Sequence, residues 1–173
     1  MRQVLIKLCA FLILFASCTG GDDTKKSVKS VLGSHFTFGK SNGRANEKIF
    51  RTGQYENYKI VSYVDSLGCI SCKLKLEEWK EFKDSISIPI IFIISPQIRK
   101  NLSLLYEIEG FTPDTTIVDF DEILKKKNHI PDDLILQTFL LNSDNTIVVV
   151  GNPVHNRAIR ELFKNKIKES NIE

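Results

Sequence analysis

Two cysteines three positions apart, Cys69 and Cys72, are the residues of this chain best suited to covalent chemistry. They follow a β-branched and aromatic run that ends at Asp65, and they precede a charged run with helical periodicity. Three positions along a helical turn bring two Cα atoms within the roughly 4.4–6.8 Å that a disulfide requires. The spacing therefore allows a redox-active pair, an inert local disulfide or, with further ligands, a metal site.

Cys69 lies at the opening of a helix that the apolar periodicity predicts over residues 70–86. Free backbone N–H groups and the positive dipole end at such a position favour the thiolate, the nucleophilic form of cysteine. Cys72 begins the apolar seam of the same helix, which continues through Leu76, Trp79, Phe82 and Ile86. We therefore expect Cys69 to be an exposed attacking thiol and Cys72 to be a covered resolving thiol.

Other chemistries find less support around this pair. Asp65, four positions before Cys69, is a candidate proton relay, although its alternative role is to cap a turn. An inert Cys69–Cys72 disulfide would close a very short loop and would stabilise the fold little on chain-entropy grounds. A metal site would need more ligands, and no histidine has a zinc-binding spacing to the pair. The histidines are His35, His129 and His155. We expect no metal and no cofactor.

The N-terminal segment has the features of an export signal. The basic residues Arg2 and Lys7 precede an apolar run over residues 8–16. This run is far shorter than the roughly 20 residues of a membrane-spanning helix. Small residues then precede Cys18, in a pattern that resembles the lipobox of bacterial lipoproteins. The resemblance implies cleavage before Cys18, lipidation of this cysteine and attachment to a membrane of the cell envelope. A plain secretory signal is the alternative.

The chain then divides into three further parts. Removal of the signal, residues 1–17, would leave 156 residues (173 − 17), which suits one domain with a single core. Residues 18–30 are small, polar and charged, so we expect a flexible tether. Residues 31–57 mix scattered apolar residues with glycine, serine and asparagine and are expected to form an irregular or hairpin lead-in. Residues 58–173 are expected to form the folded domain.

Charge and cysteine count limit the partners. The formal charge of +3 falls to +1 if the two basic residues of the signal are removed, which argues against a nucleic-acid partner. Of four cysteines, only Cys69 and Cys72 remain once Cys9 leaves with the signal and Cys18 takes the lipid. An exported protein meets an oxidising compartment, where a disulfide between the remaining two persists.

From residue 58 onward, strand and helix patterns alternate. Strands are predicted over residues 58–65, 88–95 and 115–120, and helices over 70–86, 96–109 and 121–128. A hairpin follows over residues 134–150 with turn residues at 143–145, and a last helix is expected to begin after Gly151 with Pro153 in its first turn. This order predicts an α/β fold with a mixed central sheet flanked by helices on both faces.

The strand, the C-x-x-C pair and the amphipathic helix carrying Trp79, in this order, resemble the thioredoxin-like superfamily. The stretch TFLLNSDNTIVVVG, residues 138–151, is similar to the hairpin of membrane-anchored thiol-disulfide oxidoreductases of the TlpA and ResA kind. The resemblance covers roughly residues 58–167. It implies a thioredoxin-like fold, dithiol chemistry at Cys69 and Cys72, and partners that are envelope proteins with thiols or disulfides.

One family feature is replaced in this chain. The family places a cis-proline opposite its cysteines, and the aligned position here is near Leu136. A cis peptide at a residue other than proline costs about 2.5–4 kcal/mol, so we expect a trans peptide or a different loop shape. Leu136 and Gln137, together with Tyr63 and Pro153, are candidates for the lining of a substrate groove.

Two functions stay open on the sequence. The first is an extracytoplasmic thiol-disulfide oxidoreductase, lipid-anchored in the cell envelope, that exchanges disulfides with envelope proteins. The second is a non-catalytic thioredoxin-like lipoprotein whose disulfide is structural and which binds a peptide or protein partner. The C-x-x-C pair and the hairpin favour the first function, and the replacement of proline at Leu136 favours the second.

Overall fold

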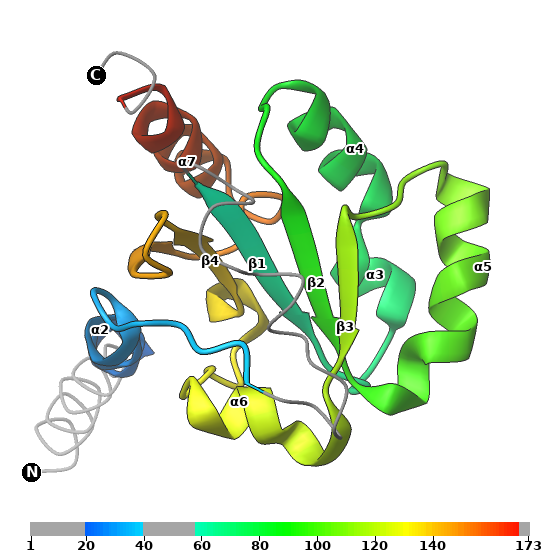
Figure 1. Ribbon diagram of the computed structural model, residues 1–173, viewed down its shortest axis with the longest axis horizontal. Coiled ribbons are helices and arrows are strands. Elements are labelled where there is room, and N and C mark those ends of the chain that lie inside the picture. Colours follow the sequence, from blue (N-terminus) through cyan, green and yellow to red (C-terminus); the bar gives the residue numbers. More distant parts are fainter. Residues whose placement is uncertain (1–19, 40–57, 170–173) are drawn as a thin grey trace, which may run out of the picture. The chain divides into compact units, whose positions relative to one another are not determined.

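The computed structural model describes residues 20–39 and 58–169 of the chain (Figure 1). The chain divides after Ser30 into two units, which we describe separately. The signal at residues 1–17, Cys18 and most of the lead-in, residues 40–57, lie outside the described residues. In the described ranges, no helix combines the length and the apolar character needed to cross a bilayer.

The described part of the segment in which we expected a flexible tether is helical. Helix α2 runs over Gly20–Val31. After its two initial glycines the segment contains no glycine or proline, and Lys29 in the last turn complements the negative end of the helix dipole. The chain then continues to residue 39 with a turn and one isolated β-bridge, between His35 and Thr146, as the only regular features of these residues.

A five-stranded mixed sheet with the order β3-β2-β1-β4-β5 forms the centre of the second unit (Figure 1). Its strands are β1 (Lys59–Val64), β2 (Ile90–Ile94), β3 (Thr115–Val118), β4 (Thr138–Leu141) and β5 (Ile147–Val150). β1, β2 and β3 are parallel, and β4 and β5 pair antiparallel with their neighbours. Every residue of β1 and β2 is buried, because both faces of the sheet are covered. The predicted α/β fold with a mixed sheet is confirmed.

The helices follow the strands in the predicted order. They are α3 (Ile70–Leu74), α4 (Leu76–Asp84), α5 (Arg99–Glu109), α6 (Ile123–Lys127) and α7 (Arg157–Glu169). Short 3-10 turns are η2 (Pro96–Ile98), η3 (Phe120–Glu122) and η4 (Leu134–Leu136). Gly110, which directly follows the helix predicted over residues 96–109, ends α5 with a φ of 61°.

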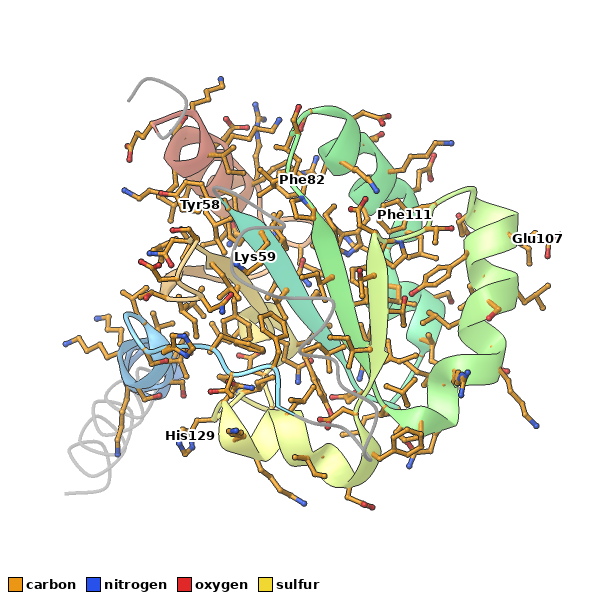
Figure 2. The ribbon with its side chains drawn as sticks, viewed as in Figure 1. Tyr58, Lys59, Phe82, Glu107, Phe111 and His129 are labelled. Atoms are coloured by element: carbon orange, nitrogen blue, oxygen red, sulfur yellow. A yellow bond between two sulfur atoms is a disulfide. The ribbon has the colours of Figure 1, made fainter. Side chains whose placement is uncertain are left out.

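Different elements pack on the two faces of the sheet. Helices α4, α5 and α7 pack on one face, where their apolar residues join those of the strands in one cluster that includes Phe82 and Phe111 (Figure 2). On the other face, the Phe36 ring lies 5.9 Å from the Phe139 ring. From α6, Lys125 Nζ lies 5.8 Å from the centre of the Tyr63 ring on this same face. The sheet is therefore flanked on both faces, as predicted.

The single helix predicted over residues 70–86 is in fact two helices. Lys75 has a left-handed conformation with a φ of 44° and separates α3 from α4. Leu74 and Leu76 on either side are 2% and 4% exposed. Residues two apart on one continuous helix point in nearly opposite directions, so the break lets both leucines enter the core. The break also changes where Cys72 points.

The last helix begins later than predicted. Pro153 lies in a turn four residues before α7 begins at Arg157. The side-chain oxygen of Asn156 accepts hydrogen bonds from the backbone N–H groups of Ala158 and Ile159, at 2.9 and 3.2 Å. Asn156 thus caps the helix, and this cap sets the start of α7 more strongly than the preference of proline for a first turn.

Candidate redox site

The cysteine pair lies in the connection from the carboxyl end of β1 to α3. Gly68 has a φ of 72°, which turns the chain directly before Cys69. Cys69 is the N-cap residue of α3, and Cys72 lies within the helix. Their Cα atoms are 5.4 Å apart, and the two sulfurs are at disulfide-bonding distance. The fold thus places the pair as the C-x-x-C spacing predicts.

Two polar groups are directed at the Cys69 sulfur. The backbone N–H of Cys72 donates to Cys69 Sγ over 3.4 Å, and Ser71 Oγ lies 3.4 Å from the same sulfur. An N-cap sulfur that receives a backbone N–H is placed where negative charge is stabilised. The contribution of Ser71 was missed from the sequence, although a hydroxyl inside a C-x-x-C pair is a signal that could have indicated it.

The expected shielding of Cys72 is wrong. Both cysteines are exposed, and the residue of α3 that enters the core is Leu74. The prediction extended the apolar seam of α4 backwards through Lys75, where the helix breaks. Access to solvent therefore does not distinguish the two sulfurs. What distinguishes them is the polar contact that Cys69 Sγ receives.

Asp65 forms an ion pair with Lys73 directly behind the cysteines. The Asp65 carboxylate accepts from Lys73 Nζ at 2.5 Å and from the backbone N–H of Leu67 at 3.0 Å. Burial acts to raise the pKa of Asp65, but these hydrogen bonds and the charge of Lys73 outweigh it and hold the pKa below its ordinary value. Asp65 therefore stays ionised and fixes α3 to the end of β1, which does not favour the proton-relay role.

Acid should weaken the fold through Asp65. Because the folded-state pKa lies below the ordinary value of 3.8, the carboxylate stabilises the fold fully above that value and loses this contribution as the pH falls toward the lowered pKa. The free energy of unfolding of Asp65→Asn should therefore fall less from about pH 5 to about pH 2.5 than that of the wild type. Urea denaturation at both pH values measures the two decreases, and equal decreases would contradict the role of Asp65.

The four residues predicted to line a groove are all buried. They are Tyr63, Leu136, Gln137 and Pro153. The Gln137 amide instead donates to the backbone oxygens of Pro131 and Asp132, at 3.0 and 3.3 Å, and lies 3.5 Å from Asp65. All peptide bonds of the described residues are trans, including those around Leu136. Gln137 thus links Asp65 to residues 131–132, and the groove role of the four residues stays a prediction.

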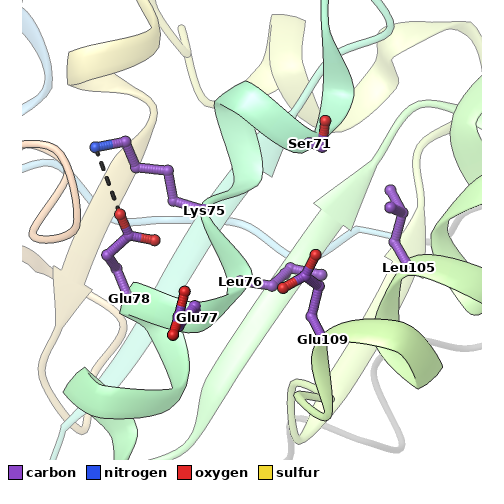
Figure 3. A pocket seen from close by; sticks show the side chains of 7 residues that line it. All are labelled: Ser71, Lys75, Leu76, Glu77, Glu78, Leu105 and Glu109. Atoms are coloured by element: carbon purple, nitrogen blue, oxygen red, sulfur yellow. Dashed lines mark ion pairs between the residues drawn. The ribbon is translucent and has the colours of Figure 1, made fainter.

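Two pockets are lined in part by residues close in sequence to the cysteine pair. One, of about 210 Å³, starts at Ser71 and lies between α3, α4 and α5, with Lys75 and Glu78 forming a 3.7 Å ion pair at its edge (Figure 3). The other, of about 310 Å³, includes Asp65 and Leu67 in its lining and follows the carboxyl ends of the parallel strands. Over residues 20–39 and 58–169, no group of three His, Cys, Asp or Glu side chains is arranged to hold a metal ion.

Comparison with a solved structure at a TM-score of 0.50 supports the fold. A Bacteroides vulgatus protein assigned as a thiol-disulfide oxidoreductase aligns with a TM-score of 0.50 and 14% identity, over 64% of this chain and 74% of that one. A thioredoxin-like protein from Parabacteroides distasonis aligns with a TM-score of 0.47 and 10% identity, over 78% and 96% of the two chains. StoA from Bacillus subtilis aligns with a TM-score of 0.46 and 20% identity, over 66% of this chain and 84% of that one. No protein-family model and no curated protein sequence matches significantly. The chain has a thioredoxin-like fold that carries a Cys69–Cys72 pair at disulfide distance.

Proposed function

We propose that this protein is a thiol-disulfide oxidoreductase in which Cys69 is the attacking thiol and Cys72 the resolving thiol. The observation that carries the proposal is the backbone N–H of Cys72, which donates to Cys69 Sγ. Among the described residues, no hydrogen bond to Cys72 Sγ is found. A thiolate is therefore better stabilised at Cys69, and the thiolate is the form that attacks disulfides.

The exchange proceeds in two displacements. The Cys69 thiolate attacks one sulfur of a partner disulfide, a mixed disulfide forms, and the second partner sulfur leaves as a thiolate. The Cys72 thiolate then attacks the Cys69 sulfur and releases the first partner sulfur. Two electrons pass to the partner, whose thiolates take up protons from water, and the Cys69–Cys72 pair ends as a disulfide. Because both cysteines are exposed, a partner reaches Cys69 without opening of the fold.

The second candidate is a non-catalytic binding protein with a structural disulfide. The burial of Leu136 and Gln137 favours it, because the loop that would face a partner polypeptide is used to support the domain. Such a protein would hold its disulfide against reduction under all cellular conditions.

A redox titration separates the two candidates. Equilibration in dithiothreitol or glutathione buffers, followed by trapping of free thiols, gives the reduction potential of the pair. The oxidoreductase is expected to lie between about −270 and −120 mV, the range of known exchange proteins, whereas structural disulfides lie below about −300 mV. A value below that limit would replace the first candidate with the second.

We further infer that the protein acts in the cell envelope, held by a lipid on Cys18. Support comes from the basic start, the short apolar run at residues 8–16 and the small residues before Cys18. Its partners are then envelope proteins that carry thiols or disulfides. Radiolabelled palmitate is expected to enter the wild-type protein in bacterial cells and not the Cys18→Ala variant. Incorporation into both proteins, or into neither, would contradict the anchor.

A further inference from the structure

We propose that the pocket beside Cys69 receives a basic side chain, arginine or lysine, of the polypeptide whose disulfide is exchanged. This inference rests on the proposed function and specifies its substrate class. The strand-end pocket, as we name it, has a volume of about 310 Å³. It is lined by residues 65–67 after β1, 95–97 after β2 and 119–122 after β3, together with Lys125.

The position of the pocket ties it to the redox pair. Leu67 lines the pocket and lies two residues before Cys69. Consecutive Cα atoms are about 3.8 Å apart, so the pocket wall begins within roughly 8 Å of the reactive residue. A side chain one to three residues from the partner's cysteine can therefore enter the pocket while the sulfurs react.

A buried hydroxyl in this pocket lacks a partner. Ser95 is 6% exposed and lines the pocket, and its Oγ has no hydrogen-bond partner among the described residues. Leaving such a group unpaired is unfavourable, so a ligand that hydrogen-bonds to it is favoured. The Ser95 hydroxyl can accept from a donor-rich ligand.

The charges lining the pocket select a cation. Lys125 is the single basic residue of the lining, against four carboxylates, and its Nζ lies 2.7 Å from Asp132 outside the pocket. Asp119 caps α6 through the N–H groups of Leu124 and Lys125, and Asp65 pairs with Lys73. Asp121 and Glu122 remain at the exposed rim. Glu122 Oε1 lies 3.8 Å from Lys125 Nζ, whereas Asp121 forms no ion pair among the described residues. An anionic ligand would be repelled here, and a cation would find Asp121 unpaired and Glu122 held by one long ion pair.

The rim also favours a cation on an aliphatic stem. Leu67 and Phe120 line the pocket and are 69% and 37% exposed. The methylene groups of arginine or lysine can cover such apolar surface while the charged head reaches the carboxylates. The Phe120 ring adds a further attraction for the cation. Carboxylates, an unpaired acceptor and an apolar rim together match a basic side chain.

The test compares peptide disulfides that differ in one residue next to the cysteine. The reduced protein is mixed with peptides carrying arginine, the neutral analogue citrulline or glutamate two residues from the cysteine, and the rate constant of exchange is measured. We expect the arginine peptide to react about fivefold faster than the citrulline peptide and faster still than the glutamate peptide. The differences should shrink in about 0.5 M salt. Equal rates for the three peptides would overturn the inference.

Two pocket variants and one control assign the preference to this pocket. Ser95→Ala and the double variant Asp121→Asn with Glu122→Gln should each reduce the arginine preference at least about twofold. Ser95→Ala should do so without lowering the Tm, because the hydroxyl has no partner in the free protein. The control is Glu107→Gln with Glu161→Gln, which removes two exposed carboxylates from α5 and α7, with Glu107 on the outer side of α5 (Figure 2). An equal loss of preference in the control, or none in the pocket variants, would overturn the assignment.

A binding measurement separates this inference from the proposed function. Peptides in which serine replaces the cysteine cannot exchange disulfides, but they can still bind the oxidised protein, and calorimetry measures their affinity. Preferential binding of the arginine peptide without any exchange by the cysteine peptides would support the pocket and contradict the enzyme. Exchange at equal rates with equal binding would support the enzyme and contradict the pocket.

Discussion

Replacing Cys69 with serine is expected to lower the rate of insulin disulfide reduction by roughly three orders of magnitude or more, to the background rate. The serine hydroxyl does not ionise at neutral pH and cannot displace a thiolate from a disulfide. Cys72 would remain exposed in this variant, but its sulfur lacks the backbone N–H that Cys69 Sγ receives. Insulin precipitation with dithiothreitol as the electron donor measures the rate.

Cys72→Ser is the matched variant for this experiment. It keeps the attacking thiol and removes the resolving one, so the mixed disulfide with the partner should accumulate and be visible on a non-reducing gel. Cys69→Ser should accumulate none. Turnover by Cys69→Ser at the wild-type rate, or mixed disulfides formed mainly through Cys72, would contradict the assignment of the two roles.

Replacing Lys73 with methionine is expected to lower the free energy of unfolding by about 2–3 kcal/mol. Asp65 and Lys73 expose only 11% and 18% of their side chains, so the substitution leaves a carboxylate in a poorly hydrated place without its cation. Methionine keeps an apolar side chain of similar length, so the decrease in the free energy of unfolding reports the removal of the positive charge. Adding Asp65→Asn to the same chain should restore most of the stability, because a neutral amide costs less to bury than a carboxylate.

An exposed ion pair provides the control for that experiment. Lys83 and Asp114 are 2.9 Å apart but expose 34% and 36% of their side chains. Lys83→Met should therefore cost at most about 1 kcal/mol. Urea denaturation of the four proteins at neutral pH gives the comparison. Equal losses for the two lysines, or no recovery on adding Asp65→Asn, would show that the buried pair does not stabilise the domain.

The sheet could be predicted from the sequence because its strands are marked by local patterns. The run that became β1 is rich in β-branched and aromatic residues, and the run that became β2 is continuous and apolar. In the hairpin turn, the side-chain oxygen of Asn142 accepts from the N–H groups of Asp144 and Thr146. The start of α7 and the break at Lys75 were missed. The break at Lys75 depends on the burial of the leucines on either side of it, and the start of α7 depends on the capping by Asn156. The periodicity of apolar residues alone determines neither of them.

The cysteine pair of the site could be predicted from the sequence, whereas the exposure of Cys72 and the residues around the pair could not. The C-x-x-C spacing gave the pair and its position on a strand-helix connection. The shielding of Cys72 failed because one backbone torsion at Lys75 turned α3 relative to α4. Asp65 and Lys73 are close in sequence, but their pairing depends on the turn at Gly68 between them. The strand-end pocket joins residues from separate parts of the chain, and their proximity follows from the order of the parallel strands, which local patterns do not contain.

The central claim is that the polar contacts at the tip of α3 make Cys69 the more reactive sulfur although both cysteines are exposed. Its most direct test is the rate of alkylation by iodoacetamide at about pH 7, measured for Cys69 in the Cys72→Ser chain and for Cys72 in the Cys69→Ser chain. Cys69 is expected to react about fivefold faster or more than Cys72 and than cysteine in an unstructured peptide. Equal rates for the two cysteines, or a faster Cys72, would contradict the account.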